Sequence, residues 1–364
     1  MNKKIAVIPG DGIGVEVIPE AVRCLDRVAE LFGHSFTYEH FLVGGCCIDQ
    51  CGVPITEETL RGCAACDAIL FGAGGGPKWD NLPHELRPER GLGTLRHHFN
   101  LFCNIRPAKV FPELMDASPL KRSVLERDGG VDLVLVRDLT GGIYFGEKGV
   151  REGKYGTEGY DVECYSKFEV ARVARRAFAL ARSRRGKLTS IDKSNTLAAS
   201  RIWRETVTEI GEAEFPDVAL DHMLVDSAAQ TLVCEPSRFD VLVTTSIFGD
   251  ILSDEAGVLT GSIGMLPSAA VNDKGFGLFE PIHGVGIAIT GLGIANPLAS
   301  IMAAAMLLRD GLGLAEEGAA VDRAVARVLR DGYRTGDIYR GEPGQTLVNT
   351  EEMGRRVAER ITRE

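Results

Sequence analysis

The chain has 364 residues, of which 45% are hydrophobic and 25% charged, a composition typical of a soluble globular protein. At about 150 residues per domain, this length predicts two domains. Lysine and arginine number 41 against 51 aspartate and glutamate residues, giving a net charge of −10. This balance argues against nucleic acid and anionic membranes as partners, so an anionic small ligand would need a local cluster of arginine or lysine.

The nine cysteines are an odd number in a long chain, which argues against a disulfide framework and favours a reducing cytosol. Cys63 and Cys66 have C-x-x-C spacing within a helix-like run at 57–67. We expect structural thiols there, with zinc or redox chemistry as the less favoured alternative. The first residues show no signal-peptide pattern, and no apolar stretch is long enough to span a membrane, so we expect a cytoplasmic protein.

Early in the chain, residues 5–8 predict a buried strand and residues 15–31 an amphipathic helix. The turn between them has glycines two residues apart, which is not the G-x-G-x-x-G order of a Rossmann dinucleotide site. Residues 68–71 predict a second strand, which runs into a glycine-rich loop at 72–79.

The middle of the chain alternates in the same way. Strands are predicted at 131–136 and 188–192, and helices at 168–185 and 198–210. Residues 151–161 are polar and glycine-rich, which predicts a projecting loop or arm. This alternation predicts an α/β layered fold.

A pair of acids follows the strand predicted at 239–243. A helix that opens near Phe248 carries Asp250 and Asp254 four residues apart, on one face. Like charges at this spacing repel unless something positive lies between them. Magnesium and manganese prefer oxygen ligands and usually take only one or two carboxylates from a protein. By itself the pair is better explained as a solvated acidic helix face, because short motifs match by chance, and a metal site is the alternative.

Three arginines predict a site for carboxylates. Arg96 and Arg106 flank residues 97–105, and Arg137 ends a predicted strand. Arginine suits bidentate carboxylate binding, and Pro107 restricts the backbone of Arg106 to an extended conformation. Any one of them alone is as well explained as an ordinary surface arginine.

Further polar residues follow predicted strands, where α/β proteins place ligands. Tyr144 and Lys193 lie in such positions, although each could equally be structural. Asp226 is a third acid available to a metal.

Eight segments in order resemble those of the isocitrate/isopropylmalate dehydrogenase family, the metal-dependent decarboxylating dehydrogenases. They include F-G-D-I-L-S-D and D-L-T-G-G-I-Y-F-G, and the resemblance covers essentially the whole chain. The segments are 8–14, 75–80, 104–109, 136–146, 191–195, 248–254, 266–269 and 294–297.

The resemblance implies a fold of two α/β domains with a mixed central sheet, not a Rossmann fold. The first domain, residues 1–101 and 261–364, holds both chain ends on the cofactor side. The second, residues 102–260, carries substrate, metal and dimer interface, with an arm near 151–165 that clasps another subunit. The implied assembly is a homodimer whose active sites lie between domains and borrow residues across the dimer.

The resemblance also implies the reaction. A small anionic 3-substituted malate is oxidised and decarboxylated with NAD and Mg²⁺ or Mn²⁺. For 3-isopropylmalate the product is 2-oxo-4-methylpentanoate, in leucine biosynthesis. The alternatives are the same reaction on another 3-substituted malate in a specialised pathway, or a non-catalytic regulatory subunit.

Site roles carry over residue by residue from the resemblance. The catalytic residues are Tyr144 and Lys193. The substrate-binding residues are Leu92, Gly93, Arg96, Arg106, Arg137, Asn195, Thr196 and Asp226. The cofactor-binding residues are Glu89, His283, Gly284, Ala288 and Asn296. The metal ligands are Asp250, Asp254 and Asp226 of the partner subunit.

In the implied mechanism, the metal polarises the C2 hydroxyl and lowers its pKa. Lys193 of the partner subunit accepts the hydroxyl proton, and Tyr144 protonates the enolate left by decarboxylation. Asn195 meets substrate and nicotinamide, and Glu89 lies beside the nicotinamide.

The sequence departs from the family at several of these positions. The family's adenosine loop reads H-G-S-A-P-D-I-A-G, whereas residues 283–291 read H-G-V-G-I-A-I-T-G, so Ala288 replaces the ribose-binding aspartate. Residues 280–297 contain no arginine or lysine, so NADP is not indicated. Loss of a charge-assisted hydrogen bond costs about 1.5–3 kcal/mol, so we expect weaker NAD binding.

Other departures concern the substrate. Gly93 follows Leu92 where the family has two apolar residues, and Thr196 stands where valine is common. These changes predict a roomier, more polar pocket for the substrate's side group. Ser246 stands where asparagine is usual.

Overall fold

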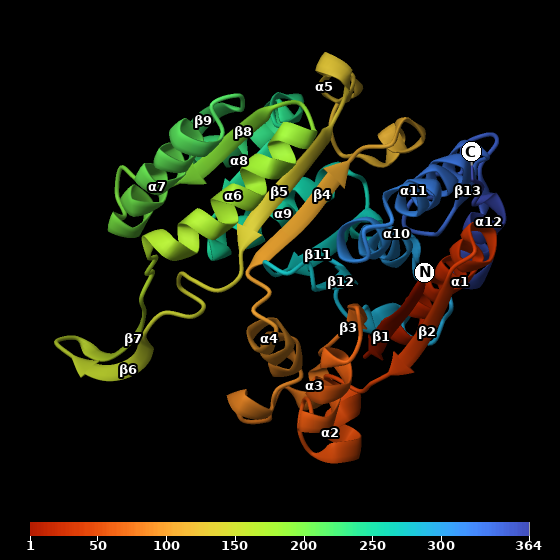
Figure 1. Ribbon diagram of the computed structural model, residues 1–364, viewed down its shortest axis with the longest axis horizontal. Coiled ribbons are helices and arrows are strands. Elements are labelled where there is room, and N and C mark those ends of the chain that lie inside the picture. The colour runs from red at the N-terminus through yellow and green to blue at the C-terminus, as the bar shows by residue number, and fades with distance from the viewer. Residues whose placement is uncertain (364) are drawn as a thin grey trace. The chain divides into compact units, whose positions relative to one another are not determined.

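The computed structural model describes residues 1–363, and the chain forms two compact units. Unit 1 comprises Met1–Leu101, Phe111–Pro119 and the residues from Thr260 onward. Unit 2 comprises Phe102–Val110 and Leu120–Leu259. Each unit combines a five-stranded mixed sheet with helices (Figure 1).

The sheet of unit 1 has the strand order β2-β1-β3-β12-β11. All neighbours are parallel except β11 and β12, which are antiparallel. All six residues of β3 are buried, as expected for a strand with both faces covered. The bounds are β1 (Asn2–Gly10), β2 (Ser35–His40), β3 (Ala68–Ala73), β11 (Pro267–Val271) and β12 (Gly277–Pro281).

Four helices of unit 1 pack on one another, and α10 is buried at every position. They are α1 (Gly14–Phe32), α10 (Leu298–Met306), α11 (Ala315–Arg330) and α12 (Thr350–Arg360). The shorter elements are α2 (Gly45–Cys51), α3 (Glu57–Ala64), α4 (Glu89–His98), β13 (Tyr333–Arg334) and β14 (Thr346–Leu347).

The sheet of unit 2 has the order β4-β5-β10-β8-β9. Only β4 and β5 are antiparallel, and their register sets Asn104 opposite Arg137. The bounds are β4 (Cys103–Lys109), β5 (Asp132–Asp138), β8 (Lys187–Asp192), β9 (Ala219–Leu224) and β10 (Val241–Thr244).

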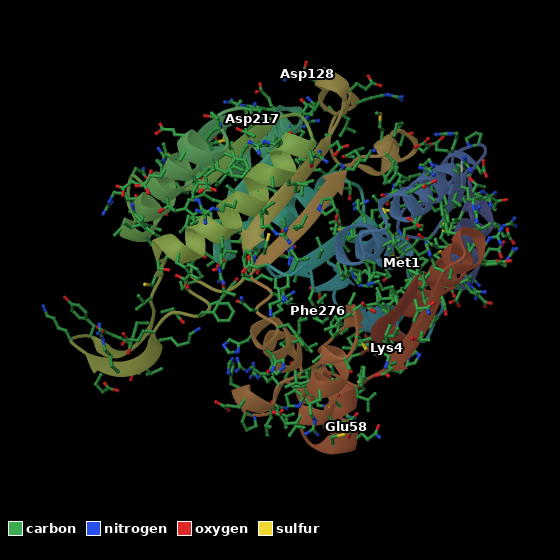
Figure 2. The ribbon with its side chains drawn as sticks, viewed as in Figure 1. Met1, Lys4, Glu58, Asp128, Asp217 and Phe276 are labelled. Carbon is green, nitrogen blue, oxygen red and sulfur yellow. The ribbon has the colours of Figure 1, made fainter. Side chains whose placement is uncertain are left out.

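Helices cover both faces of this second sheet (Figure 1). On one face lie α6 (Lys167–Ser183) and α7 (Ala198–Glu214), and on the other α8 (Val225–Cys234) and α9 (Ser246–Leu259). Helix α6 begins with a capping box made by Ser166 and Glu169. The short α5 (Arg122–Leu125) completes the unit, and exposed acids such as Asp128 and Asp217 lie at its rim (Figure 2).

Several predicted boundaries need correction. Residues 151–161, predicted as a loop or arm, lie in an antiparallel hairpin of β6 (Lys148–Gly153) and β7 (Gly156–Asp161) that projects from unit 2 (Figure 1). The strand predicted at 239–243 begins at Val241, and the buried carboxylate of Asp240 before it binds Arg184 and the amide of Arg185. The helix expected near Phe248 begins at Ser246.

The nine cysteines are free thiols. The predicted helix at 57–67 ends at Ala64, so Cys66 lies beyond it. Burial raises the pKa of Cys63 to about 12 and that of Cys66 to about 11, so both thiols are neutral at pH 7. Within residues 1–363, the helices are too short or too polar to serve as membrane spans.

Candidate active site

Asp250 and Asp254 lie one turn apart on helix α9, as the sequence predicts, and both contact the guanidinium group of Arg106. The Arg106 guanidinium is 3.7 Å from Asp250 Oδ1 and 3.5 Å from Asp254 Oδ1. The positive charge that the spacing demands is therefore supplied by arginine in this structure. The Asp254 side chain is 63% exposed, which leaves its oxygens open to a further ligand.

Arg106 and Arg137 come from neighbouring antiparallel strands and are held from several sides. Arg106 donates to Asn104 Oδ1 at 2.7 Å and to Ser253 Oγ at 2.6 Å. Arg137 donates to Asp250 Oδ1 at 2.5 Å and to the Ser246 carbonyl at 2.7 Å. Both guanidinium groups therefore have fixed orientations, as a site for a bidentate carboxylate requires.

Gly249 allows α9 to approach β5 at this point. A Cβ built on Gly249 would lie 2.6 Å from Cγ of Arg137, closer than atoms can pack. The glycine of the F-G-D-I-L-S-D segment thus lets Asp250 reach Arg137.

Tyr144 completes the cluster. Its hydroxyl donates to Asp250 Oδ2 at 3.0 Å, and the Arg137 guanidinium lies 5.6 Å from the centre of its ring. Partial burial, with the Asp250 carboxylate, raises the pKa of Tyr144. The hydroxyl therefore keeps its proton near neutral pH and is suited to act as a proton donor.

The loop that presents Tyr144 depends on residues that the sequence analysis missed. The Asp138 carboxylate accepts hydrogen bonds from the amides of Thr140 and Gly141, at 3.0 and 2.6 Å. The Tyr165 hydroxyl accepts one from the Ser246 amide, at the start of α9. Asp138 lies within a recognised segment, but nothing in the sequence signals the contribution of Tyr165.

Lys193 and Asp226 form an ion pair within one protomer. Lys193 follows β8, Asp226 lies in the first turn of α8, and Nζ is 2.6 Å from Oδ1. Lys193 lowers the pKa of Asp226. Asn195 and Thr196 follow Lys193, and the Thr196 hydroxyl donates to Asn195 Oδ1 at 3.3 Å.

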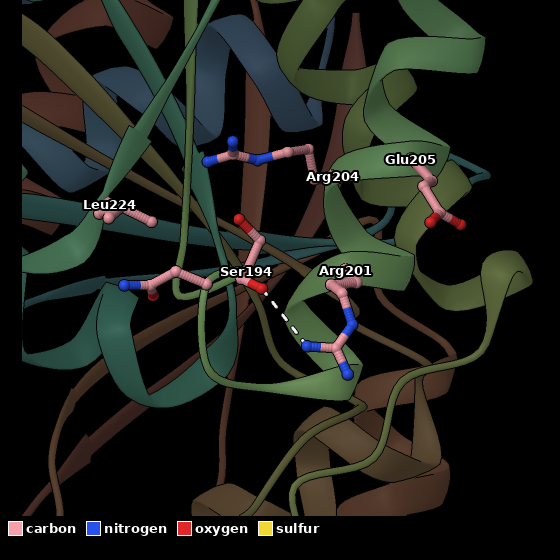
Figure 3. A pocket seen from close by; sticks show the side chains of 6 residues that line it. Ser194, Arg201, Arg204, Glu205 and Leu224 are labelled. Carbon is pink, nitrogen blue, oxygen red and sulfur yellow. Dashed lines mark hydrogen bonds between the residues drawn. The ribbon is translucent and has the colours of Figure 1, made fainter.

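A pocket of about 380 Å³ lies beside this pair (Figure 3). Arg201 donates to the Ser194 carbonyl at 3.4 Å across it, and Arg204 binds Asp192. The lining residues are Ser194, Asn195, Arg201, Arg204, Glu205 and Leu224.

In unit 1, helix α4 carries four of the predicted site residues. Arg96 is already paired with Glu280, at 2.7 Å. A Cβ built on Gly93 would meet no atom within 4 Å, so the space beside Leu92 is open. Glu89 is the first residue of the helix, and its Oε1 lies 3.2 Å from the place of a Cβ at Gly75.

Residues 283–291 contain no aspartate or glutamate that could accept hydrogen bonds from the ribose hydroxyls of a cofactor. Ala288 is exposed in a single 3-10 turn, Ile287–Ile289. The His283 ring is buried, which lowers its pKa, and Nδ1 is 3.0 Å from the Gly284 carbonyl. Asn296 caps α10 by accepting from the Leu298 amide and donates to Asp337.

The donor set fits a hard divalent cation. Asp250 and Asp254 supply two carboxylates, the usual protein contribution for magnesium. No group of three or more histidine, cysteine, aspartate or glutamate side chains suited to a metal occurs within the described residues of one protomer. Two carboxylates alone do not fill the octahedral shell that magnesium prefers, so any further ligands would have to come from water, the substrate or another chain.

The fold and these side chains define a decarboxylating dehydrogenase. The family model described as isocitrate/isopropylmalate dehydrogenase matches residues 4–357. The chain belongs to the isocitrate/isopropylmalate dehydrogenase family, and the expected fold is confirmed.

Named relatives are similar over nearly the whole chain. The 3-isopropylmalate dehydrogenase of Halalkalibacterium halodurans is 52% identical over 362 residues, covering 99% of this chain and 98% of that protein. That of Bacillus subtilis is 52% identical over 358 residues, covering 97% and 96%. The isocitrate dehydrogenase structure from Methylococcus capsulatus has a TM-score of 0.84 at 32% identity, covering all of both chains. A beta-decarboxylating dehydrogenase from Thermococcus kodakarensis has a TM-score of 0.79 at 35% identity, covering 99% and 96%.

Proposed function

We propose that the chain catalyses oxidative decarboxylation of 3-isopropylmalate to 2-oxo-4-methylpentanoate in leucine biosynthesis, with NAD and Mg²⁺ or Mn²⁺. Relatives about 50% identical bear the name 3-isopropylmalate dehydrogenase, which supports the substrate. The structural observation that carries the proposal is the cluster of Arg106, Arg137, Tyr144 and the α9 acids.

The arginines bind the malate carboxylates. Arg106 and Arg137 are fixed by their neighbours, so little side-chain entropy is lost when a carboxylate replaces an existing partner. Arg96 has the same assignment from the family resemblance, and its contact with Glu280 already fixes its direction.

The metal ligands are Asp250, Asp254 and Asp226 of the partner subunit. A bound divalent cation supplies Lewis acidity for the C2 hydroxyl and for the charge that develops on its oxygen. The Arg106 guanidinium lies within 4 Å of both α9 carboxylates and places a positive charge beside them.

Lys193 is the base for the hydroxyl proton. Its ammonium group pairs with Asp226 within the protomer, so Lys193 must leave this contact and lose a proton to solvent before the amine can accept the hydroxyl proton. Bound NAD would supply the acceptor for the hydride of C2. The resulting β-keto acid loses carbon dioxide, and the electron pair of the broken bond remains on C3.

Tyr144 returns a proton to that carbon. Its raised pKa keeps the phenol protonated through the earlier steps, and Asp250 holds the hydroxyl in one direction. Asn195 contacts the substrate and nicotinamide, and Glu89 lies beside the nicotinamide. His283, Gly284, Ala288 and Asn296 bind the rest of the cofactor.

The assembly proposed for this reaction is a cytoplasmic homodimer. Unit 1 binds the cofactor, and unit 2 binds metal and substrate and forms the dimer interface. The projecting hairpin β6–β7, with exposed Val150 and Tyr155, supports a clasp on a second subunit. The free cysteines support a reducing compartment.

Two inactive variants test whether active sites are shared. Lys193→Ala and Tyr144→Phe each damage a different part of the site. If Lys193 serves the partner's site, each mixed dimer keeps one complete site, and random pairing restores about one quarter of wild-type activity. Mixtures no more active than the two variants alone would refute sharing.

The substrate is tested with a panel of methyl-, ethyl-, isopropyl- and benzylmalate, with NAD or NADP and Mg²⁺ or Mn²⁺. The highest kcat/KM is expected for isopropylmalate with NAD. No reduction of either cofactor with any malate would refute the function. The open space at Gly93 favours one second candidate, the same reaction on a larger side group, which predicts benzylmalate as the best substrate.

A further inference from the structure

The turn between β1 and α1 contains a buried carboxylate that binds only backbone. Asp11 is 6% exposed. Its Oδ2 accepts hydrogen bonds from the amides of Gly45 at 2.7 Å and Gly75 at 2.9 Å, and its Oδ1 accepts one from the Cys46 amide at 2.7 Å. Three amide donors converge on this one carboxylate, so Asp11 links three segments that are distant in sequence.

These amides belong to two segments, the start of α2 and the loop after β3. Gly45 and Cys46 begin α2, whose own N-cap residue has no side chain to bind them. Gly75 lies in the glycine loop after β3, next to Glu89. Asp11 therefore fixes the distance from the end of β1 to the loop that lies against Glu89.

The same turn holds the adenosine segment with a second carboxylate. Glu16, in the first turn of α1, accepts from the amides of Gly291 at 2.7 Å and Gly293 at 2.9 Å. The Ile13 amide donates to the Val285 carbonyl at 2.9 Å. A Cβ on Gly12 would lie 2.0 Å from that carbonyl oxygen, so only glycine permits this approach. The turn thus holds the segment near both its ends.

Neither carboxylate forms an ion pair with another side chain in residues 1–363. Their partners are backbone amides of loops. Such contacts indicate that the two carboxylates hold the loops in place and do not themselves bind a ligand. In the dinucleotide fingerprint the turn offers its own amides to a pyrophosphate. Here the turn offers carboxylates to the amides of other loops, and those loops lie beside or contain the residues proposed to bind the cofactor.

We propose that Asp11 and Glu16 are positioning residues for NAD, with Asp11 holding the loop beside Glu89 and Glu16 holding the segment 283–293. This rests on the proposed function, in which those two segments bind the cofactor. The two carboxylates act at a distance from the reacting atoms, so they govern cofactor affinity and not the chemical step.

Asp11→Asn and Glu16→Gln test the proposal with little change in shape. An amide side chain has one acceptor oxygen and turns its NH₂ group toward a backbone N–H, so at least one loop amide loses its acceptor. Each variant is expected to raise the Kd for NADH and the KM for NAD by about tenfold, with smaller changes in kcat and in KM for the malate. Asp67→Asn and Glu30→Gln are matched controls. Asp67 accepts from the Lys4 amide near the start of β1, and exposed Glu30 pairs with Arg27 on the same helix as Glu16.

Tryptophan emission provides a readout that does not require turnover. The chain has two tryptophans, of which Trp203 is buried in unit 2 and Trp79 packs on Gly45 and Gly76. Asp11→Asn is expected to shift the emission of Trp79, and Glu16→Gln to leave it unchanged.

The outcomes separate this proposal from the function on which it rests. Selective loss of NADH affinity in both variants, with both controls at wild-type values, supports the proposal. Wild-type affinity in both variants, or equal changes in KM for NAD, KM for the malate and thermal stability, overturns it. Failure of the unaltered protein to bind NADH would instead refute the proposed function, and an unshifted Trp79 emission in Asp11→Asn would separately overturn the role of Asp11.

Discussion

Asp250 and Asp254 are both proposed metal ligands, but they have different surroundings. Their replacement by asparagine should therefore affect protein stability differently and metal dependence alike. Asp250 contacts Arg137, which is 5% exposed, and also Arg106 and Tyr144. Removing one partner of a fully buried ion pair costs about 3–5 kcal/mol. The Asp250 side chain is 41% exposed and the asparagine oxygen can still accept from Arg137, so we expect Asp250→Asn to lower the free energy of unfolding by about 1–2 kcal/mol.

Asp254→Asn is the matched control, because within residues 1–363 Asp254 forms one ion pair, at 3.5 Å, and its side chain is largely exposed. We expect it to cost less than about 0.5 kcal/mol. Both variants lose a metal ligand, so kcat/KM should fall at least about a hundredfold in each, with partial recovery at high Mn²⁺. Urea unfolding and activity across a Mn²⁺ titration measure the two effects separately. Equal destabilisation by both variants, or wild-type metal dependence in Asp250→Asn, would refute this reasoning.

Three further predictions follow from single positions. Gly93→Leu fills open space and should lower kcat/KM for benzylmalate relative to isopropylmalate by at least about tenfold; an unchanged ranking would remove this residue from the substrate pocket. Ala288→Asp adds an acceptor for the ribose hydroxyls and should strengthen NAD binding by up to about 2 kcal/mol, seen as a lower KM for NAD with little change in kcat. An unchanged KM would mean that the segment binds NAD in another way. The pKa of His283 is lower folded than unfolded, so the unfolded state gains the proton first as pH falls below about 6.5, and stability should fall with a slope of up to about 1.4 kcal/mol per pH unit. Urea unfolding at pH 7 and pH 5.5 should show a smaller difference for His283→Gln, and an equal one would contradict the assignment.

Local patterns predicted the parts of the fold that depend on spacing. The α/β alternation and the common face of Asp250 and Asp254 both follow from helix and strand periodicity. The departures at Ala288 and Gly93 were visible because the family resemblance says which residue each position usually holds.

Contacts between segments that are distant in the sequence could not be predicted from local periodicity. Arg96 lies 184 residues from Glu280, and Asp11 lies 64 from Gly75. No periodicity relates such positions, and each partner alone looks like an ordinary polar residue. The hairpin at 148–161 was predicted only as an arm, because its polar residues lack the alternation of a half-buried strand.

Two acids and two arginines meet at the start of α9, so this part of one protomer carries no net formal charge, although the whole chain carries −10. A dianionic malate or a divalent cation arriving alone would leave two uncompensated charges in a partly desolvated place. When the malate dianion and the divalent cation bind together, their charges cancel and the net charge of the site does not change. The balance built by Arg106 and Arg137 therefore links the two affinities, and reciprocity requires that each ligand tighten the binding of the other by the same factor.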